Sequence, residues 1–259
     1  MKTSLIDLSR MMAVVLVGVV FVSPAQGQYM GSLLDDFEDG TIDTAKWNPL
    51  TPTGSITEAD GVIKLANRPA LMTVGEFDPS MPLSMSFDMY FTDTQSTGET
   101  FFHTDNTTRP QDGYSVEGLG LFWDNYQNRF RFIVAHTGGH VNIIGGVGNI
   151  SVTWPEEIWL SAEVLDDGTD VSVEVYEKET PENVLLSETF SWATDIQPVL
   201  DSVGLTLDQH YVNFSCRNKP SPVETHYDNM NIQSIPEPAS LVLLLMGLVI
   251  GGICSRVRW

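Results

Sequence analysis

The feature that most constrains the fold is an alternation of apolar and polar residues with a period of two, which recurs along the middle of the chain. The segment 84–91 (SMSFDMYF) places large apolar side chains at every second position. Segments 159–165 and 170–176 alternate in the same way and are separated by the turn sequence DDG at 166–168. Such alternation is typical of a half-buried β-strand, and an Asp-Gly turn between two such runs predicts a β-hairpin.

The same pattern predicts further strands. They are expected at 61–66, 70–77, 100–104, 118–123, 129–134, 141–147, 184–190, 201–207 and 224–233. Between the two ends of the chain, no window shows a sustained apolar period of about 3.6 residues, the signature of an amphipathic helix. About a dozen short strands at this spacing predict an all-β fold, a two-sheet antiparallel jelly-roll sandwich.

The N-terminal residues 1–27 read as a secretory signal peptide. Positive charge near the start is followed by the apolar run 11–22, whose 12 residues are too few to span the hydrocarbon layer of a bilayer. Ala25 and Gly27 are the small residues that a signal peptidase reads. We therefore expect cleavage before Gln28 rather than a retained membrane anchor.

The C-terminal segment 236–259 has three parts in order: Pro236-Glu237-Pro238, an apolar stretch over 239–255 and an arginine-containing end. A helix over 239–255 would be about 25 Å long, which is marginal for a bilayer and suffices with local thinning. The arginines at its end belong on the cytoplasmic side. With an exported N-terminus, this order predicts a transmembrane helix that holds the body of the chain outside the membrane.

This tail resembles the PEP-CTERM sorting signal of exported bacterial proteins. The resemblance implies that an exosortase recognises Pro236, Glu237 and Pro238 and releases the body from its transmembrane helix. It also implies a host that makes an extracellular polysaccharide matrix, and a mature protein in the envelope, on the cell surface or in that matrix. A plain tail anchor is the alternative.

The remaining body, residues 28–235, is interpreted as one domain because no internal repeat and no Pro- or Ser-rich linker divides it. It opens with LLDDFEDG at 33–40 and closes with THYDNMNI at 225–232. These two stretches resemble the first and last strands of concanavalin A-like, laminin-G-type jelly rolls. The resemblance implies that the first and last strands lie side by side. A cellulose-binding-type β-sandwich is the competing family.

Charge and cysteine content exclude several functions. The chain has 34 acidic and 13 basic side chains and a formal net charge of -21, so its surface repels phosphate groups. Nucleic-acid binding is therefore excluded as its main function. Once the tail is removed, Cys216 is the one cysteine left, which excludes a disulfide scaffold and predicts a buried, inert thiol.

A glycan hydrolase would need two carboxylates on either side of the glycosidic bond, about 5 to 9 Å apart. Hydrolytic members of the family that the chain resembles carry them on one strand, as Glu-x-Asp-x-x-Glu or the version lacking one x, and neither pattern occurs here. Glu163 and Asp166 come closest, but they fall on opposite faces of a strand. We expect a non-catalytic protein, with a divergent glycan hydrolase or lyase as the alternative.

Acidic residues near the two ends of the body predict a structural calcium site. Asp36 and Glu38 alternate onto one face of the expected first strand, and Asp228 lies in the expected last strand beside it. Carboxylate oxygens are the ligands that Ca²⁺ prefers. Many carbohydrate-binding sandwiches of the family that the chain resembles bind calcium in this region. The alternative is an acidic strand edge that resists aggregation.

The segment WDNYQN at 123–128 combines aromatic rings with polar side chains at an expected strand end. Sugar binding needs both, so Trp123 and Tyr126 are candidate carbohydrate contacts, and WPEE at 154–157 is a second candidate. The alternative for Trp123 is a place in the core. The sequence thus predicts an exported, non-catalytic protein that binds extracellular polysaccharide. A structural matrix or appendage component without a small ligand is the remaining alternative.

Overall fold

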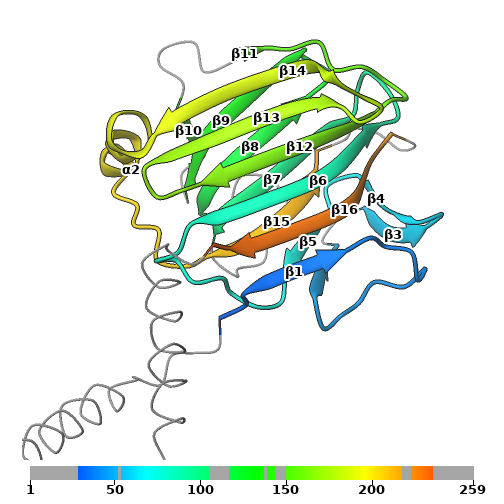
Figure 1. Cartoon of the computed structure of the whole chain (residues 1–259), viewed down its shortest axis with the longest axis horizontal. Coiled ribbons are helices and arrows are strands. Elements are labelled where there is room, and N and C mark those ends of the chain that lie inside the picture. Colours follow the sequence, from blue (N-terminus) through cyan, green and yellow to red (C-terminus); the bar gives the residue numbers. More distant parts are fainter. Residues whose placement is uncertain are drawn as a thin grey trace, which may run out of the picture.

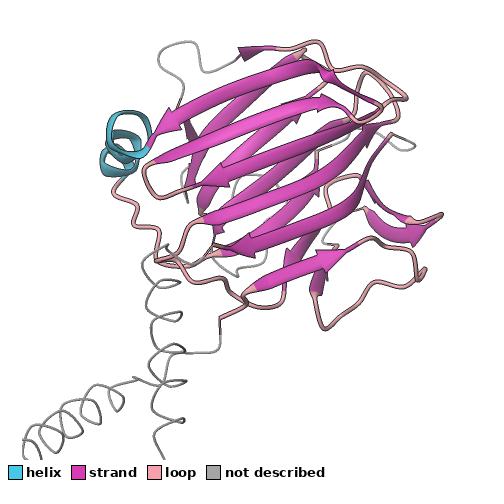
Figure 2. Ribbon diagram, in the orientation of Figure 1, coloured by secondary structure: helices cyan, strands magenta, loops and turns pink. Residues whose placement is uncertain are grey.

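The computed structural model describes residues 29–51, 54–104, 117–136, 139–143, 150–217 and 223–235. They form two antiparallel β-sheets that pack face to face as a sandwich (Figures 1 and 2). Within these ranges no helix is long and apolar enough to cross a membrane. The expected signal peptide at 1–27 and sorting tail at 236–259 lie outside the described residues.

The first sheet has the strand order β14-β13-β12-β6-β16-β4-β3, with β1 paired to β16. Its strands are β1 (Ser32–Asp35), β3 (Ser55–Ala59), β4 (Val62–Ala66), β6 (Leu83–Phe91), β12 (Trp159–Asp166), β13 (Asp170–Glu177), β14 (Thr180–Ser191) and β16 (Glu224–Ser234).

The second sheet has the order β10-β9-β8-β7-β15-β5-β2, with β11 paired to β9. Its strands are β2 (Trp47–Leu50), β5 (Ala70–Thr73), β7 (Thr97–Thr104), β8 (Gly118–Asp124), β9 (Arg129–His136), β10 (Gly139–Asn142), β11 (Ile150–Ser151) and β15 (Tyr211–Cys216). A π-helical turn, η1 (Trp192–Ile196), leads from β14 into the short helix α2 (Gln197–Val203).

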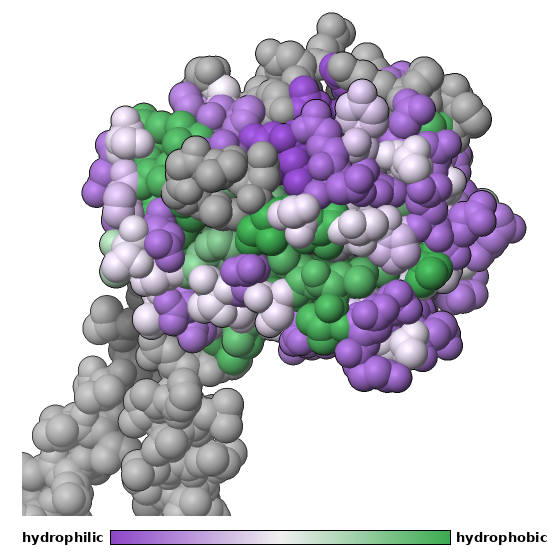
Figure 3. Space-filling model, turned by 90° about the horizontal axis from the view of Figure 1, so that it is seen from above, coloured by the Kyte–Doolittle hydropathy of each residue, from purple (hydrophilic) through white to green (hydrophobic). Residues whose placement is uncertain are grey.

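The core lies between the sheets and is built from alternate residues of each strand. Phe87 of the first sheet packs edge-on against Phe214 of the second, with ring centroids 5.0 Å apart, and also contacts Trp123 and Tyr227. Figure 3 shows the edge of the sandwich that is uppermost in Figure 1, where a central apolar area is bordered by hydrophilic residues. Burial of the large core side chains between the sheets removes apolar surface from water and is the main stabilising contribution.

The all-β jelly-roll prediction is confirmed in its main points. β12 and β13 pair as the expected hairpin, with Val164 opposite Val173. The first and last strands lie side by side, since Leu33 of β1 pairs with Ile232 of β16. The amino-terminal strand is thereby fixed into the sheet by the carboxy-terminal one.

Two sequence-based expectations about elements are wrong. The segment 201–207 does not form a strand, because its first residues complete α2 and Gly204 ends that helix in the left-handed conformation (φ 67°). The first strand ends at Asp35 instead of continuing through residue 38, because Phe37 takes a positive φ of 51° and turns the chain. Asp36 and Glu38 therefore do not alternate along a strand.

Candidate functional site

A pocket of about 460 Å³ opens where the ends of β7, β8, β9 and β15 meet. Its lining consists of Gln95, Thr97, Asp124, Tyr126, Gln127, Arg129 and Arg217. Because Trp123 points into the core, its neighbour Asp124 points to the solvent side of the second sheet. Asp124 pairs with Thr97 on one side and Arg129 on the other, so the three side chains share that face. The volume is within the range of small-ligand sites.

Asp124 shapes the pocket. Its Oδ2 accepts a hydrogen bond from Arg129 Nε at 2.8 Å, and its Oδ1 accepts one from the backbone N–H of Gln127 at 3.1 Å. Both oxygens are therefore engaged within the protein. The terminal Nη atoms of Arg129 make no hydrogen bond to any residue that the structure describes, so they can donate to a ligand.

Tyr126 lies in the turn between β8 and β9 and is 67% exposed. The turn closes through a hydrogen bond from the backbone N–H of Asn128 to the carbonyl of Asn125. The buried Asn125 donates from its side chain to the carbonyl of Asp93 and from its backbone to the carbonyl of Ser96. The turn that presents Tyr126 is thus attached to the neighbouring β6–β7 turn.

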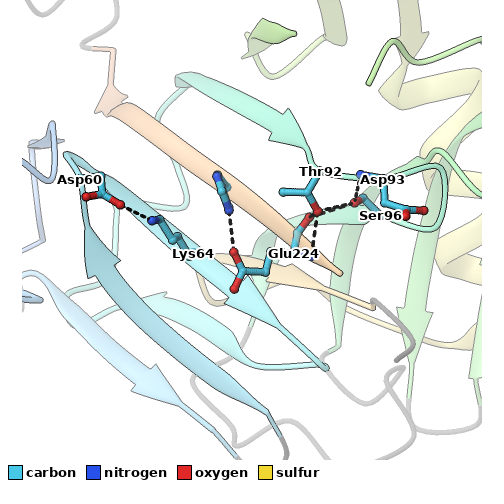
Figure 4. Close-up of polar contacts among 7 residues, drawn as sticks. Asp60, Lys64, Thr92, Asp93, Ser96 and Glu224 are labelled. Atoms are coloured by element: carbon cyan, nitrogen blue, oxygen red, sulfur yellow. Dashed lines mark hydrogen bonds and ion pairs between the residues drawn. The ribbon is translucent and has the colours of Figure 1, made fainter. Parts of the chain in front are cut away.

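The β6–β7 turn, which carries Gln95, is itself hydrogen-bonded to the start of β16 (Figure 4). The hydroxyls of Thr92 and Ser96 each donate to the carbonyl of Glu224 at 2.9 Å, and the N–H of Glu224 donates back to Thr92 Oγ1. Within the turn, Asp93 Oδ1 accepts the N–H of Gln95 at 2.8 Å. These bonds hold one wall of the pocket in place before any ligand binds.

The structure corrects the expectation that Trp123 contacts sugar. The indole is completely buried, its ring packs against Phe130 and Trp154, and its Nε1–H donates to Thr100 Oγ1 at 3.3 Å. Trp123 is therefore a core residue, the alternative that the sequence left open. Trp154, from the second candidate segment, is buried as well. Tyr126 is the one aromatic side chain of the first segment that reaches the pocket.

The three expected calcium ligands differ in their local structure and exposure. Asp36 and Glu38 are exposed beyond the end of β1, whereas Asp228 is half-buried in β16 and accepts hydrogen bonds from Asn229. Burial raises the pKa of Asp228, and the carboxylates of Asp88 and Glu38 add to the shift. Throughout the described part of the chain, no group of three or more His, Cys, Asp or Glu is arranged to hold a metal ion.

Sequence reasoning missed Gln95, Arg129 and Arg217 as residues of the pocket. They come from three separate segments, which the pairings of β7 with β8 and β15, and of β8 with β9, bring together. One signal was present: arginine is scarce in this acidic chain, so each of its positions carries information.

A second polar cluster is buried between the sheets, away from this pocket. His103 Nε2 lies 2.5 Å from Asp166 Oδ2, and Trp192 Nε1 donates to Asp166 Oδ1 at 2.8 Å. Burial opposes ionisation of Asp166, but these bonds and the charge of His103 hold its pKa below 3.8. The ring of His210 stacks on that of His103 at 3.8 Å, and burial lowers the pKa of His210 to about 3. The cluster joins β7 to β12.

Comparison with protein-family models finds no match, and comparison with curated protein sequences finds none either. Comparison with solved structures does find similar folds. Lectin II from Ulex europaeus superposes with a TM-score of 0.56 at 11% identity, covering 79% of this chain and 98% of the lectin. The body has a lectin-like jelly-roll fold.

The exoplasmic/lumenal domain of VIP36, in a form bound to Ca²⁺ and mannose, superposes equally well. Its TM-score is 0.56 at 12% identity, and the match covers 80% of this chain and 91% of that domain. At these identities the likeness concerns the fold, and function has to be argued from the site itself.

Proposed function

We propose that this protein binds carbohydrate and does not cleave it. The observation that carries the proposal is the pocket with the exposed Tyr126 ring beside the side chains of Gln95, Gln127 and Arg129. An aromatic face stacks against the apolar side of a sugar ring, while amide and guanidinium groups bond to its hydroxyls. The similar folds support the proposal, since one is a lectin complexed with galactose and another a domain bound to mannose.

Binding is favoured over hydrolysis by the carboxylates of the pocket. Among the described residues that line it, Asp124 is the one carboxylate, and both its oxygens already accept hydrogen bonds within the protein. Glycoside hydrolysis by acid–base chemistry uses two carboxylates. A divergent hydrolase or lyase is the competing function, and new reducing ends released from a polysaccharide panel would favour it.

We further propose that the protein is exported and then sorted by exosortase through Pro236, Glu237 and Pro238. The last strand ends at Ser234, so this motif follows directly on the complete sandwich. Removal of segment 236–259 would leave every described strand in place. The body would first be held at the membrane by the C-terminal helix and then reside at the cell surface, in the envelope or in the extracellular matrix.

The binding proposal is tested with the purified full-length chain in mild detergent on a glycan array. We expect at least one glycan to bind, and Tyr126→Ala to weaken that binding about tenfold, or roughly 1.4 kcal/mol, because the stacking face is lost. Tyr29→Ala, which removes another exposed tyrosine outside the pocket, is the matched control and should bind normally. A chain that binds no glycan would instead support the structural-component alternative.

A further inference from the structure

The cationic side chains of this acidic protein are unevenly distributed. The described residues include three lysines, Lys46, Lys64 and Lys178, and each forms an ion pair with at least one aspartate. They also include four arginines. Three of these lie on the outer side of the second sheet, Arg129 and Arg131 on β9 and Arg217 directly after β15. In this chain of net charge -21, three of the four arginines that the structure describes thus lie on one face.

Two of these arginines line the candidate pocket. Arg129 uses Nε to bond Asp124, which orients the guanidinium and leaves its Nη edge for a ligand. Arg217 follows β15, and its backbone N–H donates to Thr97 Oγ1 at 2.9 Å, which fixes the start of its side chain beside the same pocket. Among the described lining residues there are thus two arginines and one carboxylate.

Arg131 adds positive charge behind the pocket. It lies two residues further along β9, on the same face as Arg129. Its Nη2 and Nε donate to Asn142 Oδ1 at 3.1 and 3.2 Å, and Nη2 also contacts His140 Nε2. The guanidinium lies above the ring of Phe122. Two carboxylates act electrostatically on Arg131, Asp124 first and Glu99 second. Glu99 is completely buried and accepts a hydrogen bond from Ser215 at 3.0 Å. Glu99 does not line the pocket.

We infer that the pocket takes an acidic polysaccharide, with a uronate carboxylate bound by Arg129 and Arg217 and a pyranose ring stacked on Tyr126. A planar guanidinium matches a carboxylate through two parallel hydrogen bonds, a geometry that neutral hydroxyls do not exploit. Elsewhere the negative surface repels an anionic polymer, so attachment is confined to this face. The inference rests on the proposed carbohydrate binding and specifies its ligand class.

The test compares polygalacturonate with its methyl-esterified form, which is the same polymer without the charge, and with dextran and dextran sulfate. Binding of the full-length chain is measured by titration calorimetry at one fixed ionic strength. We expect polygalacturonate to bind at least tenfold more tightly than the ester. Arg217→Gln should remove at least tenfold of its affinity, whereas Arg68→Gln, outside this face, should leave affinity unchanged. A thermal melt of each variant confirms that it is folded.

The other outcomes separate this inference from the function on which it rests. Equal binding of the acid and the ester, with loss on Tyr126→Ala, would overturn the acidic-ligand assignment and keep carbohydrate binding. Dextran sulfate binding as well as polygalacturonate would show that the site reads charge rather than a carboxylate, which also overturns the assignment. Binding that is insensitive to both Arg217→Gln and Arg129→Gln would place the ligand elsewhere. Failure of all four polymers and of the array would overturn both proposals.

Discussion

At the scale of single residues, Asp166 shows how a buried charge is made tolerable. It is 3% exposed at the end of β12, where an uncompensated carboxylate would cost several kcal/mol. Its two oxygens contact His103 Nε2, Trp192 Nε1 and the backbone N–H of Gly168, so the charge is fully bonded. Because His103 belongs to the opposite sheet, the same bonds tie the sandwich together.

Asp166→Asn should therefore destabilise the protein by about 2 to 3 kcal/mol at pH 7, because a charge-assisted bond to His103 is lost. The pKa of Asp166 is lowered in the folded state, so its contribution is present above pH 3.8 and disappears as the pH falls through that lowered pKa. Urea unfolding at pH 7 and at a pH well below 3.8 measures this, with exposed Glu182→Gln as the neutral control. An equally large difference between wild type and Asp166→Asn in acid would contradict the assignment.

Trp123 and Tyr126 show what the sequence can and cannot predict about individual residues. Both belong to one aromatic–polar segment, and the composition of that segment predicted that both would contact sugar. Their roles separate because the alternation of β8 turns Trp123 inward, whereas Tyr126 lies after the strand ends at Asp124. Which face of a strand is covered depends on the partner sheet, and that information is not contained in the segment itself.

At the scale of elements, α2 depends on the glycine that ends it. Gly204 has φ 67° and ψ 31°, a left-handed cap that a side chain makes unfavourable, although a Cβ there would meet no atom within 4 Å. We expect Gly204→Ala to cost about 1 kcal/mol of folding free energy through backbone strain alone. Gly204→Asn should cost less, because Asn tolerates this conformation. Urea denaturation compares the two, and an equal loss for both would show that the cost is not backbone strain.

The sequence predicts β6, β12 and β13 well, because each of them is a strand with one face in the core and one face toward solvent. Their outward positions face solvent, so the apolar–polar alternation is visible. β15 was missed because polar Asn213 and Ser215 are buried on its outer side, which hides the difference between its faces. The segment 201–207 alternates like a strand, yet the chain entering it is already helical and Pro198 sits in the first turn of that helix.

At the scale of the whole molecule, the pocket and the two ends of the described body, near Gly31 and Ser234, lie at opposite ends of the sandwich. β16 begins at Glu224, beside the turns that form the pocket, and runs to Ser234, which pairs with Leu83 at the other end of β6. Its 11 residues extend over roughly 35 Å. The N–H of Ser234 donates to the carbonyl of Gly31, so both ends of the described body leave from the same side.

Because the pocket and the described termini lie at opposite ends, the proposed sorting would determine which way the pocket faces. A tail held in the membrane after residue 235 would direct the far end of the sandwich, with Tyr126 and the arginines, away from the membrane and toward extracellular polymer. Cleavage at Pro236-Glu237-Pro238 would then free the body without removing any residue of β16, so binding and stability should be the same before and after release.

We therefore expect mass spectrometry of the mature protein, produced in a host with exosortase, to find a C-terminus before residue 239 and an N-terminus at Gln28. Glu237→Ala should leave the chain in the membrane fraction with its tail attached, since the recognised motif is broken, while Gln233→Ala, upstream of the motif, should be processed normally. The melting temperatures of tailed and released forms should agree. A mature protein that is intact through Trp259 would contradict sorting by this route and make the segment 239–255 a permanent anchor, with the pocket still presented at the distal end.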